Sequence, residues 1–147
     1  MIVLAPDPVD PPALLAAFTR AASGAGAIVS FSGIVRPDGG VTGLWLDHHE
    51  QLTLAAMEEV AAIARERFGL AQIAVVHRVG SVAAREPIVF VAAAASHRRA
   101  AFDAVDFVMD RLKTAVPLWK CERRGQDRKW VEARPQDHAD AARWESP

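Results

Sequence analysis

The stretch from Ser96 to Lys120 most constrains this chain, because it predicts one long helix that turns directly into a strand. Ser96 is a good N-cap, since its hydroxyl can accept a hydrogen bond from a free N–H of the first turn. Pro117 ends the helix, because proline lacks an N–H and disfavours helix in the residue before it. Apolar residues recur at spacings of three and four, which predicts a buried helical stripe. The stripe consists of Phe102, Val105, Met109 and Leu112.

Two lysines lie on either side of this helix-to-strand turn. With 3.6 residues per turn, Lys113 points within roughly 20° of Phe102, toward the apolar side. A lysine there must extend its ammonium group to solvent or occupy a pocket. Residues 118–123 predict the next strand, which carries Lys120. The turn thus predicts one concave site that both lysines face. The alternative for Lys113 is a solvated lysine that the helix dipole stabilises.

The remaining pattern predicts an α+β fold with mixed strand order, in a single domain spanning residues 1–147. Residues 88–95 form a nearly continuous apolar run, which indicates a strand covered on both faces at the centre of a sheet. Further strands are expected at 2–5, 27–35, 41–49, 71–79 and 129–133, the last forming a hairpin with 118–123. Further helices are expected from the Asp10 cap to about residue 22, at 52–68 and at 135–144.

Composition excludes several classes of protein. The chain is 51% apolar and 24% charged, which is typical of a soluble globular protein. No apolar run approaches the ~20 residues of a membrane span, and residues 1–12 lack the features of a signal peptide. The single cysteine excludes an internal disulfide, so we expect a cytoplasmic protein.

Charge is unevenly distributed although the net charge is only −1. Between His97 and Arg134 there are ten Lys and Arg against six Asp and Glu, a surplus of four, so the other residues sum to −5. This asymmetry favours a local anion-binding site over a nucleic-acid surface. A solvated charged face is the alternative.

Other reactive side chains are weaker candidates for functional residues. Residues 47–50 read Asp-His-His-Glu, but neighbouring residues on a strand point to opposite faces, so His48 and His49 are poorly placed to hold one metal ion. Cys121 fits a small buried residue better than a nucleophile. His77 is expected in the core or at an interface, and Arg36 precedes a glycine-rich loop that could border an anion pocket.

Four motifs carry a family resemblance. SFSGIVR at 30–36, SHRRAAF at 96–102, MDRLKTAVPLWK at 109–120 and WVEAR at 130–134 resemble the large, catalytic subunit of molybdopterin synthase, over about residues 27–144. The resemblance implies an α/β hammerhead fold with an additional antiparallel sheet. It implies a sulfurtransferase of molybdenum cofactor biosynthesis that converts cyclic pyranopterin monophosphate to molybdopterin.

The resemblance also implies partners and a source of sulfur. The sulfur comes from the C-terminal Gly-Gly thiocarboxylate of a small ubiquitin-like subunit, so neither a metal nor a cofactor is expected in the large subunit. Two large subunits form a homodimer at the centre of a heterotetramer. Trp119 and Trp130 flank the expected hairpin and could anchor an interface, or they could fill the core.

Residue by residue, Lys113 and Lys120 match the family's active-site lysines. The matches to its substrate-binding residues are Phe31, Arg36, His97, Arg98 and Arg134. The resemblance leaves open which of His97, Arg98 and Arg134 acts across the dimer, which lysine performs which step, and in what order the sulfurs transfer. The chain departs from the family in a short loop after Arg36, in His49 where an aromatic residue is common, and in Cys121 after the second lysine.

Two other functions fit the same residues. The chain could be a non-catalytic module whose basic site binds the C-terminal tail of a small ubiquitin-like partner. It could also be a stand-alone transferase that depends on Cys121. The first would bind partner and pterin without turnover, and the second would lose activity on replacement of Cys121 by alanine.

Overall fold

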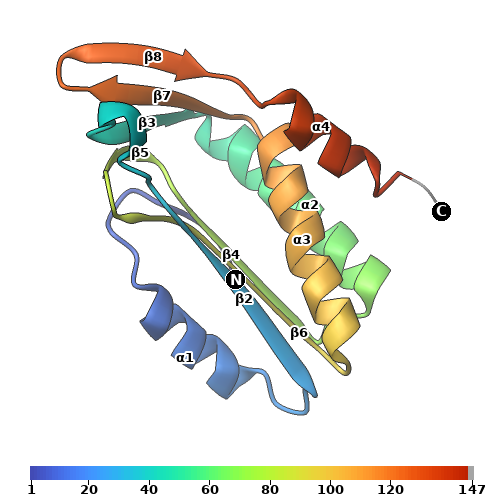
Figure 1. Ribbon diagram of the computed structural model, residues 1–147. Helices are drawn as coiled ribbons and strands as arrows, with labels where there is room; N and C mark the ends of the chain where they lie inside the picture. The colour runs from blue at the N-terminus through green and yellow to red at the C-terminus, as the bar shows by residue number, and fades with distance from the viewer. Residues whose placement is uncertain (146–147) are drawn as a thin grey trace.

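The protein consists of two four-stranded sheets and four α-helices, seen in a computed structural model that describes residues 1–145 (Figure 1). The first sheet has the strand order β1-β4-β6-β2. Its strands are β1 (Ile2–Ala5), β2 (Ala27–Ile34), β4 (Gln72–Arg78) and β6 (Pro87–Ala95). Only the pairing of β1 with β4 is parallel in this sheet, so the strand order is mixed as the sequence predicts.

Strand β6 lies at the centre of the molecule, because helices cover both faces of its sheet. Helix α1 (Pro11–Ala21) covers one face, and α2 (Glu50–Phe68) with α3 (Arg98–Thr114) covers the other (Figure 1). Residues 88–95 of β6 are therefore all buried, with Phe90 facing α1 and Val91 facing the larger core under α2 and α3. The prediction of a central strand from its continuous apolar run is confirmed.

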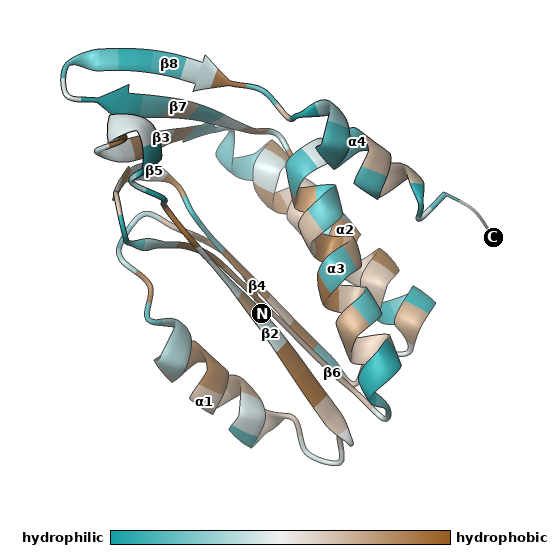
Figure 2. Ribbon diagram, viewed as in Figure 1, coloured by the Kyte–Doolittle hydropathy of each residue, from teal (hydrophilic) through white to brown (hydrophobic). Residues whose placement is uncertain are grey.

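The second sheet extends the fold at one end of the first. Its strand order is β5-β3-β7-β8, all antiparallel. The strands are β3 (Gly43–His48), β5 (Gly80–Ala83), β7 (Leu118–Arg124) and β8 (Asp127–Val131). Figure 2 shows that the β7–β8 hairpin is strongly hydrophilic, unlike the strands of the first sheet. The predicted additional antiparallel sheet is thus confirmed.

Local capping explains where the helices begin and end. Asp10 caps α1 and accepts a hydrogen bond from the backbone N–H of Ala13 at 3.1 Å. Gly69 ends α2 in the left-handed conformation at φ +61°, which glycine adopts without strain.

The last helix, α4 (Pro135–Ala142), follows β8 and packs against α3 (Figure 1). None of the helices within residues 1–145 is long and apolar enough to cross a membrane.

Two local predictions are wrong, and one strand is missing from the predicted elements. The N-cap of α3 is His97 and not Ser96, and its side chain makes no capping hydrogen bond. Phe102 is 55% exposed, because the stripe of α3 that faces the core is centred on Ala104, Phe107 and Val108. The missing strand is β5, because a run of four residues that begins with a glycine is too short a pattern to predict a strand. It exists because it pairs with β3.

Candidate active site

A pocket of about 590 Å³ lies between the end of α3, the inner face of the second sheet and the residues that precede α4. In a strand, alternate residues point to opposite faces, so Lys120, Glu122 and Arg124 of β7 share the face that lines the pocket. The chain has three lysines, and two of them, Lys113 and Lys120, line this pocket. Both lysines thus face one concave site, as the helix-to-strand turn predicts.

Lys113 lies in the last turn of α3, and its ammonium group has a carboxylate partner. Its Nζ donates to Oδ1 of Asp137 at 3.0 Å, in a salt bridge between α3 and α4. The Lys113 side chain is 38% exposed, whereas that of Asp137 is 9% exposed. The cation also suits the negative end of the α3 dipole. Lys113 therefore neither simply extends into solvent nor points into the apolar core.

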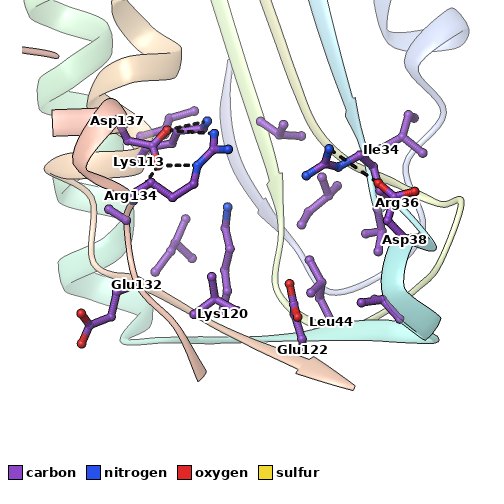
Figure 3. Close-up of a pocket in the computed structure, with 18 of the residues that line it drawn as sticks. Ile34, Arg36, Asp38, Leu44, Lys113, Lys120, Glu122, Glu132, Arg134 and Asp137 are labelled. Atoms are coloured by element: carbon purple, nitrogen blue, oxygen red, sulfur yellow. Dashed lines mark hydrogen bonds and ion pairs between the residues drawn. The ribbon is translucent and has the colours of Figure 1, made fainter. Parts of the chain in front are cut away.

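Lys120 is more enclosed, and it forms no salt bridge with any residue in the described part of the chain. Burial lowers the pKa of Lys120, and the positive charges of Lys113 and Arg134 lower it further, while Asp137 opposes them. An amine that gives up its proton readily is suited to proton transfer. Figure 3 shows the Lys120 side chain rising between the Lys113–Arg134 wall and the Arg36 wall.

Arg134 and Arg36 border the pocket on opposite sides (Figure 3). Arg134 lies beside Asp137, with Nη2 3.4 Å from Oδ1 of that carboxylate. Arg36 follows β2, and its side chain is 79% exposed, with only a loose salt bridge to Asp38 at 3.6 Å. Both guanidinium groups keep free N–H donors, which favour phosphate and carboxylate ligands.

The other predicted binding residues do not line this pocket within one chain. His97 and Arg98 lie at the opposite end of α3, fifteen positions before Lys113 for Arg98, which is roughly 22 Å along a helix. Phe31 is a 40% exposed residue of the edge strand β2 and is not among the lining residues. The structure therefore brings together Lys113, Lys120, Arg36 and Arg134, but not His97, Arg98 or Phe31.

Sequence reasoning missed one buried histidine of the pocket. His77 of β4 is 5% exposed and is one of the residues that line the pocket. Its Nδ1 lies 2.7 Å from the carbonyl oxygen of Arg78. A carbonyl oxygen can only accept a hydrogen bond, so in the neutral ring Nδ1 carries the proton and Nε2 is unprotonated. Burial, together with the charge of Lys120, lowers the pKa of His77 to about 4, against the opposing effect of the Arg78 hydrogen bond. The predicted core position is confirmed, but the pattern of β4 gave no sign of the pocket.

The structure also shows where the weaker candidates, His49 and Cys121, lie. His49 caps α2, where its Nδ1 accepts from the backbone N–H of Leu52 at 3.3 Å. Within residues 1–145 no group of three or more His, Cys, Asp or Glu is placed to hold a metal ion. Cys121 is buried at 3% exposure on the face of β7 opposite to Lys120, so it is the small buried residue that we predict.

Comparisons with known proteins identify the family. The family model described as MoaE protein matches residues 4–115. The chain is 40% identical over 146 residues to the molybdopterin synthase catalytic subunit of Caulobacter vibrioides, covering 99% of this chain and 97% of that protein.

Solved structures show the same fold. The molybdopterin biosynthesis MoaE protein from Burkholderia ambifaria superposes with a TM-score of 0.85 at 39% identity, covering 100% of this chain and 99% of that one. A chain in the protein–protein complex of subunit 1 and 2 of molybdopterin-converting factor from Helicobacter pylori has a TM-score of 0.79 at 23% identity, covering 90% of this chain and 91% of that one. Together with the pocket, these matches establish that the chain belongs to the MoaE family of molybdopterin synthase catalytic subunits.

Proposed function

We propose that this chain converts cyclic pyranopterin monophosphate to molybdopterin, with Lys113 and Lys120 as its catalytic residues. The observation that carries the proposal is the pocket in which two of the three lysines meet Arg134 and Arg36, in a chain of this family. A pterin that bears a cyclic phosphate is a compact anion. Fixed cations around one pocket are suited to bind such a ligand through charge-assisted hydrogen bonds.

The sulfur comes from the thiocarboxylate at the C-terminal Gly-Gly of a small subunit. In each transfer the thiocarboxylate sulfur forms a C–S bond to a side-chain carbon of the pterin while a C–O bond of that carbon breaks. Water then cleaves the acyl C–S bond, so the sulfur stays on the pterin and the tail leaves as an ordinary carboxylate. Two such transfers give the dithiolene with no oxidant or reductant, and water is the only further reactant. Each exchange needs a proton for the departing oxygen and a cation beside the carboxylate. Lys120, whose pKa is lowered, suits the proton transfer, and Lys113, held by Asp137, suits the cation.

Partner binding follows from the same pocket. The Helicobacter pylori chain of this fold occurs in a complex of two subunits, and we extend such a small-subunit partner to this chain. A tail of two glycines has no side chains to clash, so it can enter a narrow pocket. Its negatively charged end suits Lys113, Lys120 and Arg134.

A second copy of the chain completes the proposed site. His97 and Arg98 lie too far along α3 to act beside Lys113 of their own chain. We therefore assign them, with Phe31, to the site of the other protomer in a homodimer, which with two small subunits makes a heterotetramer. Three exposed tryptophans support an assembly surface: Trp45, Trp119 and Trp130 share the face of the second sheet that points away from the pocket. Their exposure contradicts the alternative that Trp119 and Trp130 fill the core.

Reconstitution tests the proposed function. The purified chain is mixed with a thiocarboxylated small subunit and cyclic pyranopterin monophosphate, and molybdopterin is measured. We expect Lys113→Ala and Lys120→Ala each to lose about 10²–10⁴-fold in rate, the range for a group that transfers protons. Lys129→Ala is the matched control, because Lys129 is the remaining lysine and lies on β8, outside the pocket lining.

The two alternatives give other outcomes. Near-wild-type rates for both pocket variants would refute the assignment of the lysines. Binding of tail and pterin without any product from the wild-type chain would favour the non-catalytic module. Loss of activity in Cys121→Ala, with normal folding, would favour a cysteine-dependent transferase.

A further inference from the structure

The carboxylate of Asp137 has two different tasks. Oδ2 accepts from the backbone N–H of Arg134 at 2.8 Å, which caps the first turn of α4, and it also lies 3.5 Å from Nε of the Arg134 side chain. Oδ1 accepts from Nζ of Lys113 at 3.0 Å and lies 3.4 Å from Nη2 of Arg134. One buried side chain is thus the helix cap and also the partner of both cations on this wall of the pocket (Figure 3).

Capping alone does not explain this arrangement. A glutamine at this third helical position could also accept a hydrogen bond from the backbone N–H of the N-cap residue, and it would place no full negative charge inside a pocket for an anion. Burial by itself raises the pKa of Asp137, but the hydrogen bonds from Arg134 and Lys113 outweigh it and bring the pKa to about 2. The carboxylate is therefore ionised under all conditions in which the protein is expected to work.

Lys113 depends on this partner for its position. Its side chain is long, and 38% of it is exposed, so without a partner the ammonium group would sample several rotamers in solvent. The salt bridge joins α3 to α4 across 24 residues of sequence, and it holds the ammonium group against the pocket wall.

We propose that Asp137 is a positioning residue, which fixes Nζ of Lys113 and the guanidinium group of Arg134 so that both meet the substrate in one geometry. The proposal rests on the proposed function for the role of Lys113, and it adds a residue that the family resemblance did not supply. Asp137 acts through its two neighbours and does not itself touch the reacting atoms.

The test variant is Asp137→Asn, because asparagine separates the two tasks. Its amide oxygen can still accept from the backbone N–H of Arg134, so the cap survives, while its NH₂ group faces Lys113 and cannot accept from it. We expect a loss of about 10–100-fold in kcat, because a displaced catalytic group costs this much. The melting temperature should stay close to that of the wild type.

A pH profile gives a readout that a merely structural role would not move. The negative charge of Asp137 raises the pKa of Lys120, whereas burial and the charges of Lys113 and Arg134 lower it. Removal of the Asp137 charge should therefore lower the pKa of Lys120 further. The limb of the kcat profile that reports Lys120 should move to lower pH in Asp137→Asn. The ionisable groups that face Asp137 and Lys120 around the pocket are His77, Lys113, Glu122, Arg124, Glu132 and Arg134, with Arg36 and Asp38 on the far wall.

Two further variants complete the design. Asp140→Asn removes one carboxylate from the same helix, where it only accepts from Gln136, and it should leave rate and profile unchanged. Asp137→Glu keeps the negative charge, and glutamate is favoured at this position of a capping box. This variant should therefore recover part of the rate. It also keeps the test decisive if Asp137→Asn does not fold.

A double variant separates this proposal from the proposed function. In a Lys113→Ala background, Asp137→Asn should cost little more, because its main effect passes through Lys113. Equal loss in both backgrounds, or an unchanged rate and profile in Asp137→Asn, would overturn the positioning role and leave the lysine assignment intact. A fully active Lys113→Ala would instead overturn the catalytic role that the proposed function gives to Lys113.

Discussion

At the scale of single residues, burial sets the charges of the pocket side chains. His77 illustrates this, because its pKa of about 4 in the folded protein lies well below the ordinary value of 6.5. A pKa that is lower in the folded state means that the unfolded state binds the proton first as pH falls. The buried neutral histidine therefore stabilises the fold above pH 6.5, and this contribution is lost as pH falls toward 4.

We predict that His77 makes the protein sensitive to acid. Between pH 7.5 and pH 5 it should reduce the free energy of unfolding by about 2 kcal/mol. Denaturant titrations of His77→Gln should show a smaller loss over this interval than the wild type. His138→Gln is the control, because His138 is exposed on α4. An equal loss for His77→Gln and wild type would refute the prediction.

Arg36 and Arg134, on opposite sides of the pocket, give a second prediction at this scale. Arg36→Ala and Arg134→Ala should raise KM for the cyclic pterin more than they lower kcat, because each removes a charged hydrogen bond worth about 1.5–3 kcal/mol. Arg36 should lie at or below the lower end of this range, since its side chain is 79% exposed. Arg128→Ala on β8 is the control, outside the pocket lining. Unchanged pterin affinity in isothermal titration for both pocket variants would rule out the anion-binding role.

At the scale of elements, the position of α4 depends on residues that follow it. The Trp144 ring packs edge-on against Phe68 at 5.9 Å and Phe107 at 5.6 Å between ring centroids, and its Nε1 donates to Oδ2 of Asp110 at 2.7 Å. Arg143 reaches the same carboxylate oxygen at 2.8 Å. These contacts hold the end of α4 against α2 and α3, and so they hold Arg134 and Asp137 at the other end beside Lys113.

We predict that Trp144→Ala loosens α4 and weakens the site at a distance. The loss of free energy of unfolding should be about 2–3 kcal/mol, at or below the lower end of the range for a buried tryptophan because this ring is partly exposed. Hydrogen exchange should speed up in α4 more than in α2, and kcat should fall although Trp144 lines no part of the pocket. Trp144→Phe keeps most of the ring packing and should retain most activity. Unaltered exchange in α4 of Trp144→Ala would show that other contacts hold the helix.

At the scale of the whole molecule, the positions of the predicted site residues fit the proposed homodimer. Four of the seven line one pocket, while Phe31, His97 and Arg98 lie elsewhere on the same chain. In a two-fold symmetric dimer, each copy can complete the site of the other with residues from a distant surface. Light scattering should then report a dimer without the small subunit and a heterotetramer with it.

Mixed dimers test the sharing of residues between protomers. Arg98→Ala and Lys120→Ala chains are first assayed alone, and are then unfolded, mixed in equal amounts and refolded together. Half of the dimers then contain one chain of each kind, and in these one of the two sites is intact, so about a quarter of wild-type activity should return. Activity no greater than the mean of the two variants, or a monomer at micromolar concentration, would contradict the shared site.

Sequence alone determined the features that depend on neighbours along the chain. The cap at Asp10, the stop at Gly69, the continuous apolar run of β6 and the alternation along β7 are local patterns, and each has one physical consequence for backbone or burial. The same locality placed Lys113 and Lys120 at one site, because only a short turn separates their elements.

Only the tertiary structure decided the features that depend on distant partners. Strand β5 exists because β3 offers it an edge, and Phe102 is exposed because α2 and the sheet cover a different side of α3. Lys113 and Asp137 stand 24 residues apart, and no pattern links them, so their salt bridge appears only when α4 packs on α3. His77 acquires its charge state in the same way, because the dielectric environment and nearby charges of a side chain come from whatever the fold packs around it.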